Sequence, residues 1–323
     1  MNTIVETPLL VESLVKRLSE RYVFPDRSAR ATRLLLARLE QGAYEPTVSP
    51  ELCERISADL FEVTNDKHLR LLWHESAETS RDEAQLIAEL HETFRLNNQG
   101  VRRVERLPGN IGLIELTLIP EASTAGPTLA ATMQLVQHTY ALILDLRSTL
   151  GGSPDGVAFL ASFLFANGDV HLNDIVEGPR GPTRQYWTSA YLPGPRYLDR
   201  PVYVLTSAST FSGGESLAYD LQALGRAIIV GETTRGGAHP SEVVSLAEQI
   251  ELRLPVARAI NPVTGTNWES VGVAPDLPAQ AADALDVARR AALETIADDA
   301  ALPSATREEA RLLLDSLRDH PAV

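Results

Sequence analysis

Residues 140–165 read YALILDLRSTLGGSPDGVAFLASFLF, and this stretch decides the fold class. It begins with a continuous apolar run, passes through a turn that contains paired glycines, and continues with apolar residues at helical spacing. A strand that is apolar throughout is typical of a sheet whose two faces are both covered by helices. The stretch therefore predicts a strand, a turn and a crossover helix of an α/β domain.

The same alternation continues on both sides of this stretch. Strands are predicted at IGLIELTL (111–118), PVYVLT (201–206) and RAIIVG (226–231), and helices near LAATMQLVQH (129–138) and ESLAYDLQALG (215–225). We therefore expect an α/β catalytic domain over residues 101–282.

Two segments depart from this alternation. Residues 169–200 form a Pro- and Gly-rich insertion, and EVVSLAEQIELRLPVARA (242–259) alternates like antiparallel strands. These segments predict α+β elaborations at an edge of the sheet.

Helical spacing dominates both ends of the chain. Apolar residues recur every three or four positions in LLVESLVKRLSERY (9–22), SARATRLLLARLEQGAY (28–44) and SPELCERISADLFEVT (49–64), and again in ALDVARRAALETIADDA (284–300). A short strand is predicted at LRLLWH (69–74). We expect a helical N-terminal domain over 1–100 and C-terminal helices over 283–323 that pack on the core.

Composition and charge exclude several classes of protein. The 323 residues carry 29 Lys plus Arg against 43 Asp plus Glu, a net charge of −14 that repels nucleic acid and anionic membranes. No apolar run approaches the roughly 20 residues that span a bilayer. A single cysteine, Cys53, cannot form an internal disulfide, and the N-terminus does not resemble a signal peptide. We therefore expect a cytoplasmic protein with no nucleic-acid or membrane partner.

Two turns follow predicted strands, where sites form in open α/β sheets. Gly151 and Gly152 end one strand and precede a helix, so their amides could stabilise an oxyanion, or the turn could be an ordinary tight one. Ser212 opens the helix after PVYVLT, between Phe211 and Gly213, and could be a nucleophile. Ser212 and Glu215 also have the S-x-x-E spacing of a capping box, so Ser212 could simply cap the helix.

Further candidates lie outside these two turns. Trp268 and Glu269 lie in NPVTGTNWESVGVAPD (261–276), where a carboxylate beside an indole could orient an imidazole, or could be a surface loop residue. His68 lies at a predicted helix-to-strand junction that could direct it into a cleft, and His239 in RGGAHP could line a site. A lone histidine is more often structural or solvated than catalytic.

Read together, four ordered motifs resemble the tail-specific, or C-terminal processing, family of serine peptidases, nearest its interphotoreceptor retinoid-binding protein-like branch. These motifs are NDKHL (65–69), ALILDLRSTLGGSPDG (141–156), the segment from VYVLTSASTFSGGE to GETTRGGAHP (202–240), and TGTNWESVGVAPD (264–276). The N-terminal RYVFPD and QGAYEP also resemble the helical domain that precedes such catalytic cores. The resemblance implies a ClpP/crotonase-like catalytic fold.

The resemblance also implies roles for particular residues. Ser212 occupies the nucleophile position, and the amides of Gly213 and of Gly151 or Gly152 would form the oxyanion hole. Gly236 and Gly237 stand where one sub-class of the family has a lysine base, so a serine–lysine dyad is disfavoured. The other sub-class, as in the tricorn core protease, implies His68 as the base and Glu269 as its support.

The implied function is hydrolysis of peptide bonds through an acyl-enzyme, without a metal or organic cofactor, on a peptide or an unfolded protein. Many family members insert a PDZ domain, for which residues 66–110 leave no room, and a homo-oligomer stays open. Two alternatives remain. One is a non-catalytic binder of apolar ligands or peptides, although the serine, histidine and glycines are all present. The other is a thioester enzyme with a coenzyme A pocket, against which the serine in TFSGGE argues.

Overall fold

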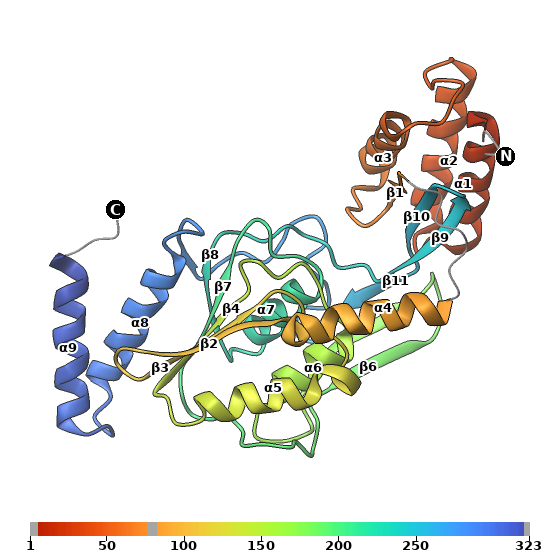
Figure 1. The fold of residues 1–323 in the computed structure, drawn as a ribbon. Helices are drawn as coiled ribbons and strands as arrows, with labels where there is room; N and C mark the ends of the chain where they lie inside the picture. The colour runs from red at the N-terminus through yellow and green to blue at the C-terminus, as the bar shows by residue number, and fades with distance from the viewer. Residues whose placement is uncertain (1–5, 76–82, 320–323) are drawn as a thin grey trace. The chain divides into compact units, whose positions relative to one another are not determined.

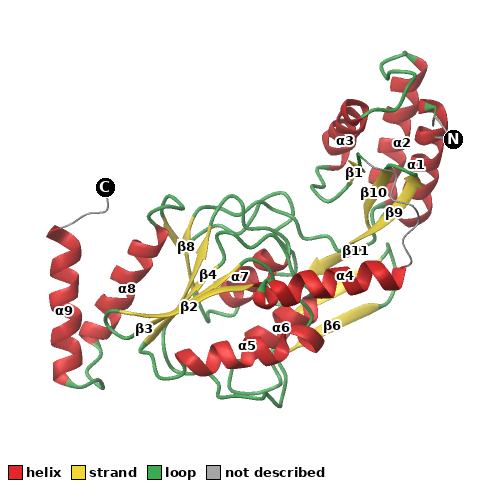
Figure 2. Cartoon of the chain, viewed as in Figure 1, coloured by secondary structure: helices red, strands yellow, loops and turns green. Residues whose placement is uncertain are grey.

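The computed structural model describes residues 6–75 and 83–319, which divide into two compact units (Figures 1 and 2). The first unit combines the residues up to 87 with 174–184 and 237–260. The second unit combines residues 88–173, 185–236 and those from 261 onward. Two later segments of the chain thus return to the first unit, which no local pattern in the sequence predicts, and the boundaries near 100 and 282 stay a prediction.

The first unit packs three helices against a small antiparallel sheet. The helices are α1 (Thr7–Arg21), α2 (Pro25–Glu40) and α3 (Pro50–Thr64), and the sheet has the order β1 (Arg70–Trp73), β10 (Ile250–Pro255), β9 (Ser241–Ala247). The helices begin where the sequence predicts, because each has a proline in its first two positions, where a missing N–H loses no helical bond. Leu14, Leu35, Ile56 and Leu252 are fully buried in one shared core.

Most of the antiparallel segment predicted at 242–259 therefore lies in this small sheet, as β9 and β10, and its last residues belong to β11 (Ala257–Ile260) of another sheet. Leu71 of β1 pairs with Leu252 of β10, so a strand from the helical region completes the hairpin of β9 and β10. A third sheet has the order β11, β5 (His171–Glu177), β6 (Thr183–Trp187). The Pro- and Gly-rich insertion thus contains a hairpin, in which the amide of Glu177 donates to the carbonyl of Pro182 over 3.1 Å.

The second unit is built on a six-stranded sheet. Its order is β12 (Leu277–Pro278), β8 (Ile228–Gly231), β7 (Val202–Thr206), β4 (Ala141–Asp145), β3 (Ile111–Leu116), β2 (Val101–Leu107). Only β2 runs antiparallel to its neighbour. Every residue of β4 and β7 is buried, which confirms the strands with two covered faces that the apolar runs predict.

Helices cover both faces of this sheet (Figure 1). One side holds α8 (Ala284–Asp298) and α9 (Ser304–Asp319). Ala288 and Ala292 of α8 share a core with Ile143 and Tyr203 of the sheet. The other helices are α4 (Glu83–Leu96), α5 (Ala122–Val136), α6 (Pro154–Ser162), α7 (Gly213–Ala223) and the short η1 (Asn98–Gly100). Between β1 and β3 the described residues form only α4, η1 and β2, so the expected absence of a PDZ domain is confirmed within them.

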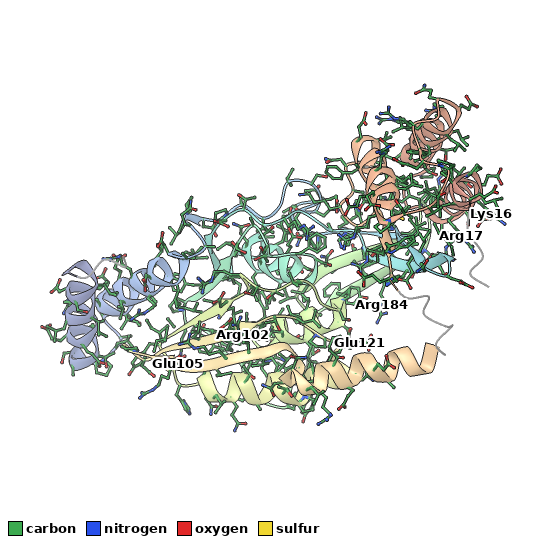
Figure 3. The ribbon with its side chains drawn as sticks, turned by 45° about the horizontal axis from the view of Figure 1, so that its top comes forward. Lys16, Arg17, Arg102, Glu105, Glu121 and Arg184 are labelled. Carbon is green, nitrogen blue, oxygen red and sulfur yellow. The ribbon has the colours of Figure 1, made fainter. Side chains whose placement is uncertain are left out.

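The outer strand β2 is charged (Figure 3). Arg102 forms an ion pair of 3.2 Å with Glu115 on β3, and Arg103 pairs with Glu105 along the strand. Charged side chains on an edge strand oppose pairing with the sheet of another molecule. Among the helices in the described part of the chain, none has the length and apolar composition that a membrane span requires.

Candidate active site

Ser212 stands between β7 and α7 in a strained backbone conformation. Its φ is 53° and its ψ is −114°, a region that residues with a β-carbon rarely occupy. Such a conformation costs about 1–3 kcal/mol and persists only where the surrounding structure enforces it. A sharp, strained strand-to-helix turn of this kind exposes a serine hydroxyl at the end of a sheet in serine hydrolases.

Glu215 holds this turn in place. Its carboxylate is fully buried and accepts from the amide of Ser212 over 2.8 Å, from the hydroxyl of Thr234 over 2.6 Å and from the amide of Gly236 over 2.5 Å. The bond from Ser212 is the carboxylate half of the capping box that the S-x-x-E spacing predicts. The bonds from Thr234 and Gly236 go further, because they join the start of α7 to the loop after β8.

A glycine loop lies beside Ser212. It follows β4, which pairs in parallel with β7. The glycine loop and the turn of Ser212 therefore both lie at the carboxyl ends of the parallel strands. The amide of Phe211 donates to the carbonyl of Thr149 over 3.0 Å, and a β-carbon built on Gly151 would lie 3.9 Å from Cβ of Ser212.

The glycine amides of this loop and of α7 are available to a ligand. Within the described residues, the amides of Gly151, Gly152 and Gly213 donate no hydrogen bond. Gly213 is the first residue of α7, where backbone amides have no partner inside the helix. Amides that converge beside a serine hydroxyl can stabilise an oxyanion that forms on a substrate carbonyl.

We expect Gly213→Ala to abolish activity and to destabilise the second unit. A β-carbon at Gly213 would lie 2.5 Å from the amide nitrogen of Gly152 and 2.6 Å from its α-carbon, so backbone would have to move. Gly126→Ala is the matched control, because its β-carbon would lie no closer than 3.6 Å to Phe159. Peptide hydrolysis and thermal unfolding of both variants measure the effect. Wild-type turnover by Gly213→Ala would contradict the close packing that we assign to these glycines.

Glu269 lies on a loop that contacts both α7 and the loop after β8. Trp268 is buried against Tyr219 of α7, with ring centroids 5.3 Å apart, and the amide of Ser270 donates to the carbonyl of Gly236 over 3.2 Å. Gly236 in turn binds Glu215. The half-buried Glu269 is thus carried by a loop that is anchored both to the helix that Ser212 begins and to the loop that Glu215 binds.

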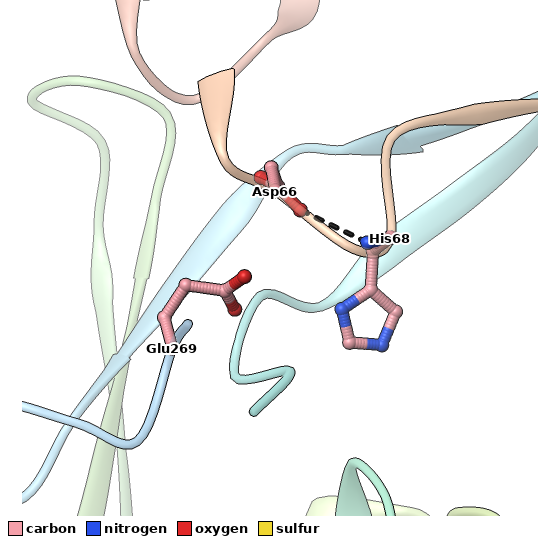
Figure 4. Close-up of side chains that lie close together, drawn as sticks. All are labelled: Asp66, His68 and Glu269. Atoms are coloured by element: carbon pink, nitrogen blue, oxygen red, sulfur yellow. Dashed lines mark hydrogen bonds between the residues drawn. The ribbon is translucent and has the colours of Figure 1, made fainter. Parts of the chain in front are cut away.

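His68 lies in the first unit, at the predicted junction between α3 and β1. Asp66 is buried two residues earlier, and its Oδ1 accepts from the backbone amide of His68 over 3.0 Å (Figure 4). His239 is also buried, and its Nδ1 lies 2.8 Å from Oδ2 of the same carboxylate. Tyr22, which follows α1, donates its hydroxyl to that oxygen over 3.1 Å.

Burial controls the ionisation of this group. It lowers the pKa of His68 to about 4; the Asp66 carboxylate opposes this shift, and Arg253, His239 and Arg70 add to it. Burial would raise the pKa of Asp66, but the hydrogen bond from His239, the charge of that imidazole and the His68 amide together hold it below its usual value. Desolvation of the His68 imidazole therefore outweighs its attraction to the Asp66 carboxylate.

The structure thus places the predicted residues in two groups. Ser212, the three glycines and the loop of Glu269 are joined within the second unit, and His68 and His239 share Asp66 within the first. Glu215 was anticipated only as a helix cap, and its role in joining loops was missed. Asp66 and Tyr22 were missed because their contacts join distant segments; the D-x-H spacing in NDKHL was the one local signal for Asp66.

Within each unit taken alone, the described residues contain no group of three His, Cys, Asp or Glu side chains close enough to hold a metal ion. Cofactor-free chemistry stays a prediction.

A strained serine at the start of a helix, beside glycine amides and at the edge of a parallel sheet, defines the class of serine hydrolases. Comparison with known proteins specifies the family. Residues 110–279 match the model of peptidase family S41, and residues 2–101 match that of the N-terminal domain of peptidase S41 in eukaryotic IRBP. The first match covers more than half of the chain, so this chain belongs to peptidase family S41. The resemblance drawn from the four motifs is confirmed.

Individual relatives agree with this assignment. Carboxyl-terminal-processing peptidase 2 of the chloroplast of Arabidopsis thaliana is 30% identical over 211 residues, which are 63% of this chain and 39% of that protein. The match therefore spans only about two fifths of that relative's length. A lipoprotein from Streptococcus agalactiae superimposes with a TM-score of 0.58 at 17% identity, covering 90% of this chain and 98% of that one. The photosystem II D1 C-terminal processing protease gives 0.53 at 15% identity, covering 85% and 93%. These two structures support the fold.

Proposed function

We propose that this protein is a serine peptidase that hydrolyses peptide bonds through an acyl-enzyme, with Ser212 as nucleophile, His68 as base and Glu269 as support. The observation that carries the proposal is the strained backbone of Ser212, which Glu215 enforces beside three glycine amides. A residue that only caps a helix does not require such strain, since ordinary caps have extended backbone angles. The conformation therefore favours a nucleophile over a simple cap.

Each residue has a definite part in the proposed reaction. Ser212 Oγ attacks the carbonyl carbon of the scissile bond while His68 accepts its proton, and the negative charge forms on the carbonyl oxygen. The amides of Gly213 and of Gly151 or Gly152 stabilise that oxyanion. The C–N bond then breaks as the imidazolium returns the proton to the leaving amine. Water attacks the acyl-enzyme in the same way, and Glu269 holds the imidazole in the tautomer that both steps need.

The substrate that we infer is a peptide or the end of an unfolded protein. The curated relative is named for carboxyl-terminal processing, which supports a preference for chain ends. Because the described residues between β1 and β3 form no PDZ domain, substrate selection would depend on the catalytic unit and the N-terminal unit themselves. A cytoplasmic setting agrees with the single cysteine, Cys53, which is buried as a free thiol.

We expect kcat/KM to stay constant as the pH falls from 8 to about 5, and to halve near pH 4. Only the neutral imidazole of His68 can accept a proton, and its pKa of about 4 keeps it neutral over this range. The lowered pKa also means that this group contributes stability above about pH 6.5, which is lost as the pH falls toward 4.

Asp220→Asn separates the acidic fall in kcat/KM, which we assign to His68, from a change in stability that comes from ionisation of Asp220. Burial raises the pKa of Asp220, on α7, to about 8, so its contribution to stability is complete below about pH 4 and is lost as the pH rises through 8. The variant should remove that dependence and leave the acidic limb of the rate profile in place. A midpoint at or above pH 6.5 in the wild type would contradict the pKa that we assign to His68.

Labelling with a fluorophosphonate, followed by peptide mapping, tests the proposed function without knowledge of the substrate. We expect one adduct, at Ser212. The reagent reacts with a serine that a base activates and that lies beside an oxyanion hole, because the negative charge forms on the phosphonyl oxygen of the reagent. An unlabelled protein that binds peptides without cleaving any of a diverse library would instead establish the non-catalytic binding protein.

A further inference from the structure

A buried polar cluster in the first unit lies outside the proposed triad. It consists of Tyr22, Asp66 and His239, whose exposed fractions are 3%, 0% and 3%. The three residues come from the end of α1, the loop after α3 and the segment before β9. Buried charged groups are costly unless they are hydrogen-bonded, so this cluster requires an explanation.

Asp66 is the centre of this cluster. Its Oδ2 accepts from the Tyr22 hydroxyl over 3.1 Å and from Nδ1 of His239 over 2.8 Å, while its Oδ1 accepts from the amide of His68 over 3.0 Å. The amide of Asp66 also donates to the hydroxyl of Thr64 over 3.3 Å, which anchors the loop to the end of α3. Three donors from three parts of the chain therefore fix one carboxylate, and that carboxylate fixes the backbone of His68.

We propose that Asp66, His239 and Tyr22 are positioning residues, which hold the turn that carries His68. This inference rests on the proposed function of His68 as the base. None of the three needs to touch the substrate, since Asp66 binds the backbone of His68 and the other two bind Asp66.

The chemistry of the pair determines the state of His239. A carboxylate only accepts hydrogen bonds, so Nδ1 of His239 carries the proton and its Nε2 is an acceptor when the ring is neutral. The rings of Phe24 and His239 also pack in an edge-to-face arrangement, with centroids 5.0 Å apart, which restricts rotation of the imidazole. The hydrogen bond from His239 therefore holds the Asp66 carboxylate in place, with its Oδ1 toward the His68 amide.

The position of His239 in the chain adds a second consequence. It follows Gly236, whose amide binds Glu215 beside Ser212, by three residues. The hydrogen bond between His239 and Asp66 thus anchors the chain three residues after the contact of Gly236 with Glu215. The sequence allows His239 to line the site, and we propose instead that it positions Asp66.

Two substitutions at His239 separate hydrogen bonding from packing. His239→Phe keeps a planar ring but removes the donor, whereas His239→Asn places an amide N–H near the position of Nδ1. We expect His239→Phe to lower kcat about 10- to 100-fold, with KM changed less than threefold, because a base displaced by about 1 Å loses rates of this order. His239→Asn should recover most of that loss.

The pH profile provides a readout that a purely structural role would not move. Asp66 raises the pKa of His68, and His239 lowers it. Removing His239 removes that lowering effect, so the acidic midpoint of kcat/KM should move upward in both His239→Phe and His239→Asn, since neither replacement carries a charge.

His74→Phe is the matched control. His74 also pairs with a carboxylate of the first unit, Glu251, at 2.9 Å, but this pair is about one third exposed. Its loss should change neither kcat nor the midpoint. If His239→Phe does not fold, Tyr22→Phe replaces it, because it removes one donor to Asp66 and keeps the ring. We expect a several-fold lower kcat in that variant.

The outcomes distinguish the two proposals. Equal losses in His239→Phe and His239→Asn, or an unchanged pH midpoint in every folded variant, would overturn the positioning role while wild-type activity stands. A wild type that neither reacts with a fluorophosphonate nor cleaves peptides would instead overturn the proposed function. A lower kcat in His239→Phe that His239→Asn largely restores, with a raised midpoint in both variants, establishes the positioning role.

Discussion

Ser212→Ala is expected to abolish peptide hydrolysis and fluorophosphonate labelling, with a fall in kcat on the order of 10⁴-fold or more. The substitution removes the one atom that forms the acyl-enzyme, and no other group can take its place. Peptide affinity should stay near the wild-type value, because the hydroxyl contributes little to binding of the ground state. Steady-state kinetics, labelling and calorimetric peptide titration measure the three quantities.

Ser209→Ala is the control for Ser212→Ala. Ser209 lies three residues earlier in the same loop and is exposed, so its hydroxyl should contribute neither to the turn nor to catalysis. Circular dichroism and thermal unfolding should show both variants folded. Equal turnover by wild type and Ser212→Ala would remove Ser212 as nucleophile. Equal ligand binding by both with cleavage by neither would favour the binding protein.

His68→Ala should lower kcat nearly as much as Ser212→Ala, on the order of 10³-fold or more. Nucleophile and base act as one chemical unit, so the double variant should be scarcely worse than either single variant. Glu269→Gln should have a smaller effect, because a less well-oriented imidazole can still accept the proton. Rate constants for the wild type, Ser212→Ala, His68→Ala and the double variant complete a double-mutant cycle.

Additive losses in this cycle would contradict the proposed pair of nucleophile and base. Substantial turnover by His68→Ala would assign the base to another residue, and His239 would be examined first because its imidazole is already oriented by a buried carboxylate. His138→Ala is the control for loss of an imidazole, since His138 is exposed in the second unit.

Most of the sheet and its helices could be predicted from the sequence because their signals are local. The apolar run that forms β4 and the helical spacing of α6 lie within one short stretch, and the structure reproduces both. The hairpin of β5 and β6 was missed, because the prolines and glycines of this segment indicate turns, and its short strands depend on pairing with each other and with β11. The lowered pKa of His68 could not be predicted for a related reason, since desolvation depends on everything packed around a side chain.

By itself the sequence determined the order of the elements, the serine at the start of a helix and the glycines at the neighbouring turn, because periodicity and turn chemistry act over a few residues. Tertiary structure alone decided the contacts between distant segments. It paired β1 with β10, joined Asp66 to His239 across 173 residues, and strained Ser212 through a buried glutamate that also binds the loop after β8. Such contacts depend on which buried polar groups meet once the core has formed, and no local pattern along the chain encodes that meeting.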